Sequence, residues 1–129
     1  MKAMPGRSIV TIFAVVLCFA SVSLRAHHSA VLFDISKTFS IAGTLTKVDW
    51  RNPHVELFVE TKRDDDKAET WELETGAPAW FRGRNLEKSA FEKAIGQTIA
   101  VEGVRAKDGS PYGYLYKIVF PDQSTFDLR

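Results

Sequence analysis

Residues 39–50, with the sequence FSIAGTLTKVDW, decide the predicted fold because their apolar positions alternate with a period of two. Every second residue from Phe39 to Leu45 falls on one face, as expected of a β-strand that buries one side. The apolar parity then moves by one residue and continues at Val48. A change of parity inside a continuing strand is what a β-bulge produces, and Gly43 makes sharp coiling easier. The segment therefore predicts a bent first strand, such as a small barrel needs.

Two further strands follow on the C-terminal side. The turn Arg51-Asn52-Pro53 ends the first strand, and apolar residues alternate again at 55–59 and at 71–73. A polar hairpin loop at 62–67 separates these two strands. We therefore expect three consecutive strands in the first half of the domain.

A helical segment comes next. Pro78 is expected to begin a short helical turn, and apolar side chains then recur at helical spacing over residues 86–95. Asn85 is the predicted N-cap, and Gly96 is predicted to lie just past the helix C-terminus.

The last part of the chain returns to β-structure. Alternation predicts a fourth strand at 99–103 and a fifth at 112–120, in which the three tyrosines share a face with Ile118 and Phe120. Residues 126–128 add a short sixth strand. The predicted core consists of Ile41, Leu45, Val55, Leu57, Val59, Trp71, Leu73, Phe91, Ile99 and Val101.

This order of elements favours a mainly β fold: a small five- to six-stranded OB-like barrel with one helix between strands three and four. A split barrel and an open α+β sheet are the alternatives. OB barrels bind many classes of ligand, so the fold by itself does not assign a function.

The first 26 residues differ from the rest of the chain. A positive start is followed by an uncharged apolar run from Ile9 to Ala20 and then by small residues, which is the plan of a secretory signal peptide. Cleavage fits best after Ala26, with Ser23 as the second choice, and a retained membrane anchor is the competing interpretation. We thus expect a signal peptide at 1–26, an N-terminal arm at 27–37 and an OB-like domain at 38–129, in a periplasmic or secreted protein that leaves the membrane after cleavage.

Composition narrows the chemistry of the mature chain. The chain has a net charge of +1, and residues 1–26 carry three basic residues and no acidic residue, so the mature charge is −2. This charge disfavours nucleic acid as a partner. Cys18, the one cysteine, lies in the predicted signal peptide. Any metal site in the mature protein is therefore built from nitrogen and oxygen ligands.

Several motifs in this order resemble a bacterial family of small exported proteins, the family of unknown function numbered 6152. They include His-His-Ser at 27–29, Trp-Arg-Asn-Pro-His at 50–54 and Arg-Ala-Lys-Asp-Gly-Ser at 105–110. The resemblance covers nearly all of the mature chain, and one departure is Ala30, where an aromatic residue is expected. It implies an exported protein of this architecture and supplies no catalytic residues.

The three histidines all lie in two of these motifs. His27 would offer its α-amine and imidazole to one metal ion, and His54 would supply a third nitrogen, as in the histidine brace of copper proteins. This donor set suits Cu(II). His28 is an alternative ligand, and Glu74 or Asp34 could supply oxygen. In the other interpretation, the N-terminal histidines form a frayed terminus and His54 bonds to a turn carbonyl.

Other functional classes have weaker support. Glu56 with Glu60, and Glu72 with Glu74, are interpreted as solvated strand faces, and the chain contains no phosphate-binding loop or nucleophile elbow. We therefore expect a binding module rather than an enzyme, although a copper redox enzyme would use the same ligands. The alternative is an interaction domain that binds a peptide, an envelope protein or a small ligand without metal. The aromatic pair at 80–81 would then anchor a partner instead of plugging the core.

Overall fold

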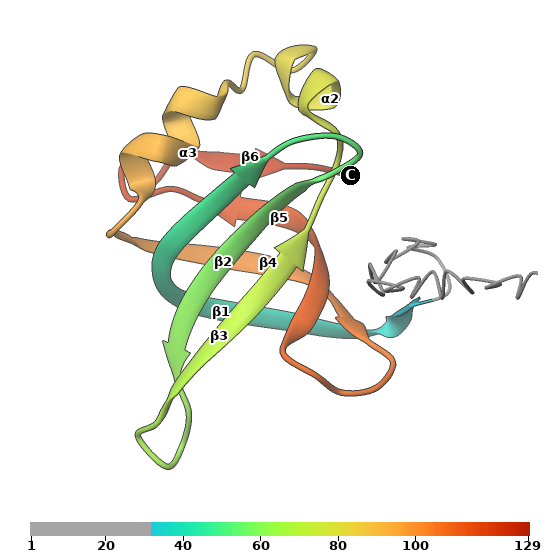
Figure 1. Cartoon of the computed structure of the whole chain (residues 1–129), viewed down its shortest axis with the longest axis vertical. Helices are drawn as coiled ribbons and strands as arrows, with labels where there is room; N and C mark the ends of the chain where they lie inside the picture. Colours follow the sequence, from blue (N-terminus) through green and yellow to red (C-terminus); the bar gives the residue numbers. More distant parts are fainter. Residues whose placement is uncertain (1–31) are drawn as a thin grey trace, which may run out of the picture.

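The computed structural model describes residues 32–129, and this part of the chain is mainly β, as predicted. Figure 1 shows a strongly coiled sheet with two short helices at one end. The elements are β1 (Phe33–Trp50), β2 (Val55–Lys62), β3 (Ala68–Glu74), α2 (Pro78–Arg82), α3 (Lys88–Ala94), β4 (Thr98–Ala106), β5 (Tyr112–Val119) and β6 (Thr125–Asp127).

The strands form one sheet in the order β3-β2-β1-β4-β5-β6, with antiparallel pairing along this order. An additional parallel pairing joins β3 to β5, with Glu72 opposite Tyr112 and Glu74 opposite Tyr114. As a result, each strand from β1 to β5 has at least two neighbours. The parallel pairing also brings the end of β3 to the beginning of β5, which determines the position of the site described below.

β1 is bent as the sequence predicts. Its register against β2 shifts between Leu45 and Lys47, so the predicted bulge is confirmed. A Cβ atom at Gly43 would lie 2.4 Å from the backbone oxygen of Glu60 and 2.9 Å from a methyl group of Val59. Glycine therefore allows β1 to pass close to β2 where it bends. The part of β1 before the bend pairs mainly with β4, and the part after it pairs with β2.

β1 also starts earlier than expected. It begins at Phe33 and pairs there with Ala106 of β4, whereas the alternation predicted a strand from Phe39. The register shifts between Asp34 and Thr38. Because this irregularity interrupts the period-two pattern, the sequence signal disappears although the strand continues.

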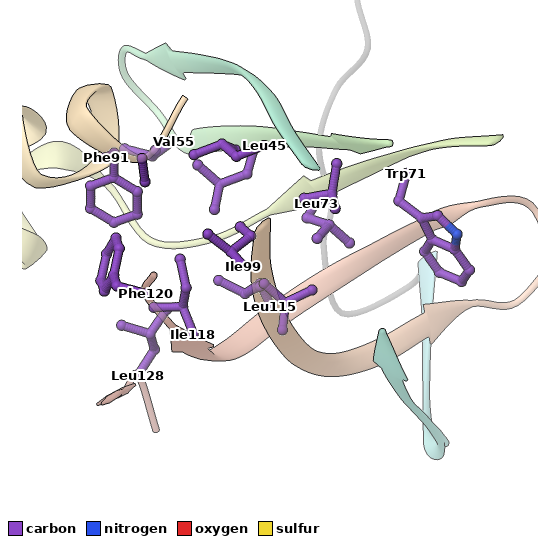
Figure 2. Close-up of a cluster of buried hydrophobic side chains, with 14 of the residues drawn as sticks. Leu45, Val55, Trp71, Leu73, Phe91, Ile99, Leu115, Ile118, Phe120 and Leu128 are labelled. Carbon is purple, nitrogen blue, oxygen red and sulfur yellow. The ribbon is translucent and has the colours of Figure 1, made fainter. Parts of the chain in front are cut away.

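The hydrophobic core agrees closely with the predicted one (Figure 2). Nine of its ten predicted residues are buried, and Ile41 packs against the cluster while partly exposed. Aromatic rings fill the end under the helices, where Phe91 lies 5.5 Å from Phe81 and 5.4 Å from Phe120 between ring centroids. Phe81 has no exposed surface, so this half of the aromatic pair is a core plug.

The helical segment agrees with the prediction in part: Pro78 begins the short helix α2, as expected, but the predicted single helix and its N-cap are not observed. It consists of two helices, and the N-cap of α3 is Glu87 instead of Asn85. Asn85 has a φ of 57°, in the left-handed region that asparagine tolerates better than most residues. Its backbone N–H donates to the carbonyl of Arg82, so Asn85 closes the turn after α2. Gly96 follows the helix end with a φ of 83°, as expected.

The tyrosines of β5 lie on the opposite face of the strand from the one predicted. Leu115 is fully buried, whereas Tyr112 and Tyr114 are half-buried on the opposite face, so the prediction that they share a face with Ile118 is wrong. The pairing with β4 explains the error, because Glu102 is opposite Lys117 while Gly103 is opposite Leu115. One extra residue, Tyr116, is inserted there and inverts the parity.

Two predictions fall outside the described residues: the signal peptide, and the position of His27 and His28. Within residues 32–129, none of the helices is long and apolar enough to cross a membrane.

Candidate functional site

The structure brings together two of the predicted metal ligands, His54 and Glu74. His54 Nδ1 lies 2.8 Å from Glu74 Oε1. His54 directly precedes β2, and Glu74 is the last residue of β3. Antiparallel pairing places these strand ends side by side, and the backbone hydrogen bond from Thr75 N–H to the Val55 carbonyl extends that pairing. Hairpin geometry thus joins residues that are distant in sequence.

Glu74 is fully buried, which corrects the expectation of a solvated strand face. Its second oxygen, Oε2, accepts a hydrogen bond of 2.5 Å from the Tyr112 hydroxyl. A buried carboxylate is tolerated only where hydrogen bonds or opposite charges replace its hydration. His54 and Tyr112 provide such contacts, one at each oxygen.

Tyr112 was not predicted as a site residue. Tyr112 is adjacent to β3 through the parallel β3–β5 pairing, and no local pattern encodes that pairing. The alternation also assigned Tyr112 to the face of Ile118, which is wrong because the inserted residue at Tyr116 inverts the faces of β5. A prediction of the β3–β5 register would have been needed to find this residue.

Acidic side chains lie around the tyrosines of this site. Burial raises the pKa of Tyr112 above its ordinary value of 10, and so do its hydrogen bond to Glu74 and the charges of Glu74, Glu72 and Glu56. Burial and the charge of Glu74 likewise raise the pKa of Tyr114. Both shifts favour the neutral phenol over a phenolate. Burial disfavours any charge, so only the charges of Glu74, Glu72 and Glu56 favour a cation here.

The start of β1 packs against the same tyrosines. The Phe33 ring lies 5.3 Å from the Tyr112 ring and 5.8 Å from the Tyr114 ring, measured between centroids. Phe33 is itself buried, and the Leu32 carbonyl accepts a hydrogen bond from the Lys107 backbone N–H. The chain therefore enters the domain one side chain away from Glu74.

Asp34, the other predicted oxygen donor, has local contacts. Its carboxylate accepts hydrogen bonds from the backbone N–H and the hydroxyl of Ser36, and it lies 3.6 Å from Lys37 Nζ. The Ser36 bonds, with the charge of Lys37, lower the pKa of Asp34. The side chain thus stabilises an irregular part of β1.

In the part of the chain that the structure describes, no group of three or more histidine, cysteine, aspartate or glutamate side chains is arranged to hold a metal ion. His54 and Glu74 therefore form at most part of such a site. The other two predicted ligands, His27 and His28, precede the described residues.

A concave region lies between α3 and the turn from β5 to β6. It encloses about 710 Å³ and is lined by apolar side chains such as Ala90, Phe120 and Phe126, with Lys93 and Asp122 among the polar ones. Its charged groups come from separate segments. This region thus lacks the convergent, buried polar groups found around Glu74.

Comparison with curated proteins finds no match for this chain. A family of unknown function, DUF6152, matches residues 14–115. The match includes both His54 and Glu74, as well as Tyr112. Because it extends over most of the 129 residues, the chain belongs to the DUF6152 family.

Proposed function

We propose that this protein is an exported binding module that holds a divalent metal ion, preferably Cu(II), through His27 and His54. His28 is the alternative ligand, and Glu74 lies beside the ligand set. The observation that carries the proposal is the 2.8 Å contact between His54 Nδ1 and the buried Glu74 carboxylate. A metal-binding histidine almost always donates its other ring N–H to a carboxylate, a carbonyl or water. The pair has the form expected of such a ligand and its support.

The charge around the pair also favours a cation. Glu74 has no exposed surface, and Glu72 and Glu56 lie near enough to affect Tyr112. A metal ion at His54 would gain from these charges, which are less screened at a buried site than on an open surface. The nitrogen-rich donor set, without sulfur in the predicted mature chain, favours Cu(II) over Cu(I).

The length of the N-terminal segment is compatible with the proposal. His27 precedes Phe33 by six residues, and six extended residues span at most roughly 20 Å. Phe33 contacts Tyr112, Tyr112 bonds to Glu74, and Glu74 contacts His54. Three successive side-chain contacts thus connect the start of β1 to His54.

The proposal includes the finer features of the fold and the compartment. The circuit of pairings through β1, β2, β3, β5 and β4 supports an OB-like barrel whose outer face carries the site. The signal-like residues 1–26 support export and cleavage after Ala26, which would make the α-amine of His27 available as a ligand. We propose a binder and not an enzyme.

A Cu(II) titration of three proteins tests the function. They are the mature chain beginning at His27, the same chain with one additional glycine before His27, and His54→Ala. The mature protein should bind one equivalent. Both variants should bind at least tenfold more weakly, because the glycine moves the α-amine out of the chelate and His54→Ala removes an imidazole. Intact mass confirms each N-terminus, and circular dichroism confirms that each protein is folded.

Equal binding by all three proteins would contradict the proposed ligands, and so would the absence of binding by the mature chain. In either case, the interaction domain without metal would become the better hypothesis. Copurification of a peptide, an envelope protein or a small ligand with the mature chain would support that alternative.

A further inference from the structure

The contact between His54 and Glu74 distinguishes the two nitrogens of the imidazole. His54 Nδ1 lies 2.8 Å from Glu74 Oε1, and because an ionised carboxylate repels a lone pair and accepts a proton donor, this contact favours the proton on Nδ1. In the neutral imidazole the other nitrogen, Nε2, then has the lone pair. A metal ion binds that lone pair, so the carboxylate determines which nitrogen serves as the ligand.

Glu74 is well held for this task. The residue is in register with Glu56 on one side and with Tyr114 on the other, so neighbouring strands flank its backbone. Its side chain is completely buried. The hydrogen bond from Tyr112 to Oε2 fixes the rotation of the carboxylate and turns Oε1 toward His54.

Tyr112 is held in turn. Its ring packs against Phe33 at 5.3 Å, and β5 pairs with β3 and β4 on either side of it. The series from Phe33 through Tyr112 and Glu74 to His54 therefore consists of direct contacts.

We infer that Glu74 and Tyr112 are positioning residues for the metal site, which hold His54 as the Nδ1–H tautomer so that Nε2 binds the metal. This inference rests on the proposed function and deepens it, since it gives Glu74 a supporting role in place of a ligand role. It also assigns Tyr112 to the site. Such supporting groups typically change metal affinity by about 10- to 100-fold when they are mutated.

The chain offers a matched control for Tyr112. Tyr114 lies two residues along β5, is also half-buried and packs against the same Phe33 ring. The hydroxyl that donates to Glu74 Oε2 belongs to Tyr112. Tyr112→Phe and Tyr114→Phe thus remove the same atom from neighbouring places, but only Tyr112→Phe removes the bond to Glu74.

Two measurements on the mature protein test the inference. Long-range ¹H–¹⁵N spectra of the metal-free protein report the tautomer of each histidine, and His54→Ala identifies the His54 signals. Wild type and Tyr114→Phe should show the Nδ1–H form of His54, whereas Glu74→Gln should show a mixture of tautomers. In Cu(II) titrations, Tyr112→Phe should bind about tenfold more weakly than wild type, and Tyr114→Phe should bind within about twofold of it.

The outcomes separate the inference from the proposed function. If wild type binds Cu(II) and the two tyrosine variants bind equally well, the positioning role is wrong and the metal site remains. An Nε2–H tautomer of His54 in the metal-free wild type would also overturn the inference. If wild type binds no Cu(II), the proposed function fails and the inference fails with it. Should Tyr112→Phe not fold, Glu74→Gln in the same titration decides the question.

Discussion

Glu74 illustrates how a single residue can be costly for the fold and useful for a site. Removing a carboxylate from water is expensive unless its partners are well placed, and this carboxylate contacts His54 at one oxygen and Tyr112 at the other. An apolar side chain would fill the same space without that cost. The polar cluster is thus better explained by binding than by stability.

The Tyr112 hydroxyl gives a prediction about alkaline pH. Because the pKa of Tyr112 is raised above 10 by burial and by Glu74, the folded protein holds this proton more tightly than the unfolded chain does. The resulting stabilisation is present in full below pH 10 and is lost as the pH rises toward the raised pKa. The free energy of unfolding of wild type, measured by urea denaturation, should therefore fall more steeply above pH 10 than that of Tyr112→Phe. Parallel pH profiles for the two proteins would contradict this account.

At the scale of single residues, the sequence indicated which side chains could bind a metal, but not how deeply they are buried or what they contact. His54 was predicted as a ligand because the three histidines all lie in two motifs, and Glu74 was named as a possible oxygen ligand; the structure brings the two into contact. The burial of Glu74 was missed, because alternation assigns a residue to a face without showing what covers that face. Tyr112 was missed as a site residue because its contact with Glu74 spans 38 residues.

At the level of elements, β1 determines the shape of the sheet. It pairs with β4 before its bend and with β2 after it, and so it connects the two sides of the fold. Gly43 and the irregularity between Leu45 and Lys47 lie where the partner changes. A straight strand could not follow both partners, so the bend is required by the topology.

Substitution of Gly43 tests this interpretation of β1. In Gly43→Ala, the new methyl group would meet the Glu60 backbone oxygen at 2.4 Å, and backbone cannot move aside as a side-chain end can. We expect a loss of about 1–3 kcal/mol in the free energy of unfolding, measured by urea denaturation. Ser40→Ala, at an exposed position of the same strand, should change it by less than about 0.5 kcal/mol. Equal stability of both variants would show that β1 does not need glycine at this bend.

Elements were predictable wherever their signal was local. The faces of β2 were correct because Val55, Leu57 and Val59 alternate without interruption and all three are fully buried. The predicted start of β1 and the predicted faces of β5 were wrong because the strand pairing is irregular there. Each register shift changes the parity of the residues that follow. Asn85 was misassigned because asparagine favours both N-caps and left-handed turns.

At the scale of the whole molecule, the core and the proposed site use different side chains, since neither His54 nor Tyr112 belongs to the hydrophobic cluster. The rings of Phe81, Phe91 and Phe120 form one aromatic cluster of the core beside α2 and α3, and Figure 2 shows Trp71 at the other end of the core. The polar cluster lies where the end of β3 meets the start of β5. A change at His54 should therefore affect binding while the core remains intact. The mainly β architecture was predictable from the strand patterns. The β3–β5 pairing was not predictable, because it joins segments far apart in the chain and has no local sequence signal.

The most direct test of the central claim is anomalous diffraction at the copper edge. Crystals of the mature protein beginning at His27, grown with one equivalent of Cu(II), would locate the metal without reference to activity. We expect one strong peak, bonded to His54 Nε2 and to the α-amine and imidazole of His27, with Glu74 contacting Nδ1. Absence of a peak, or a peak bound elsewhere with His54 uninvolved, would contradict it.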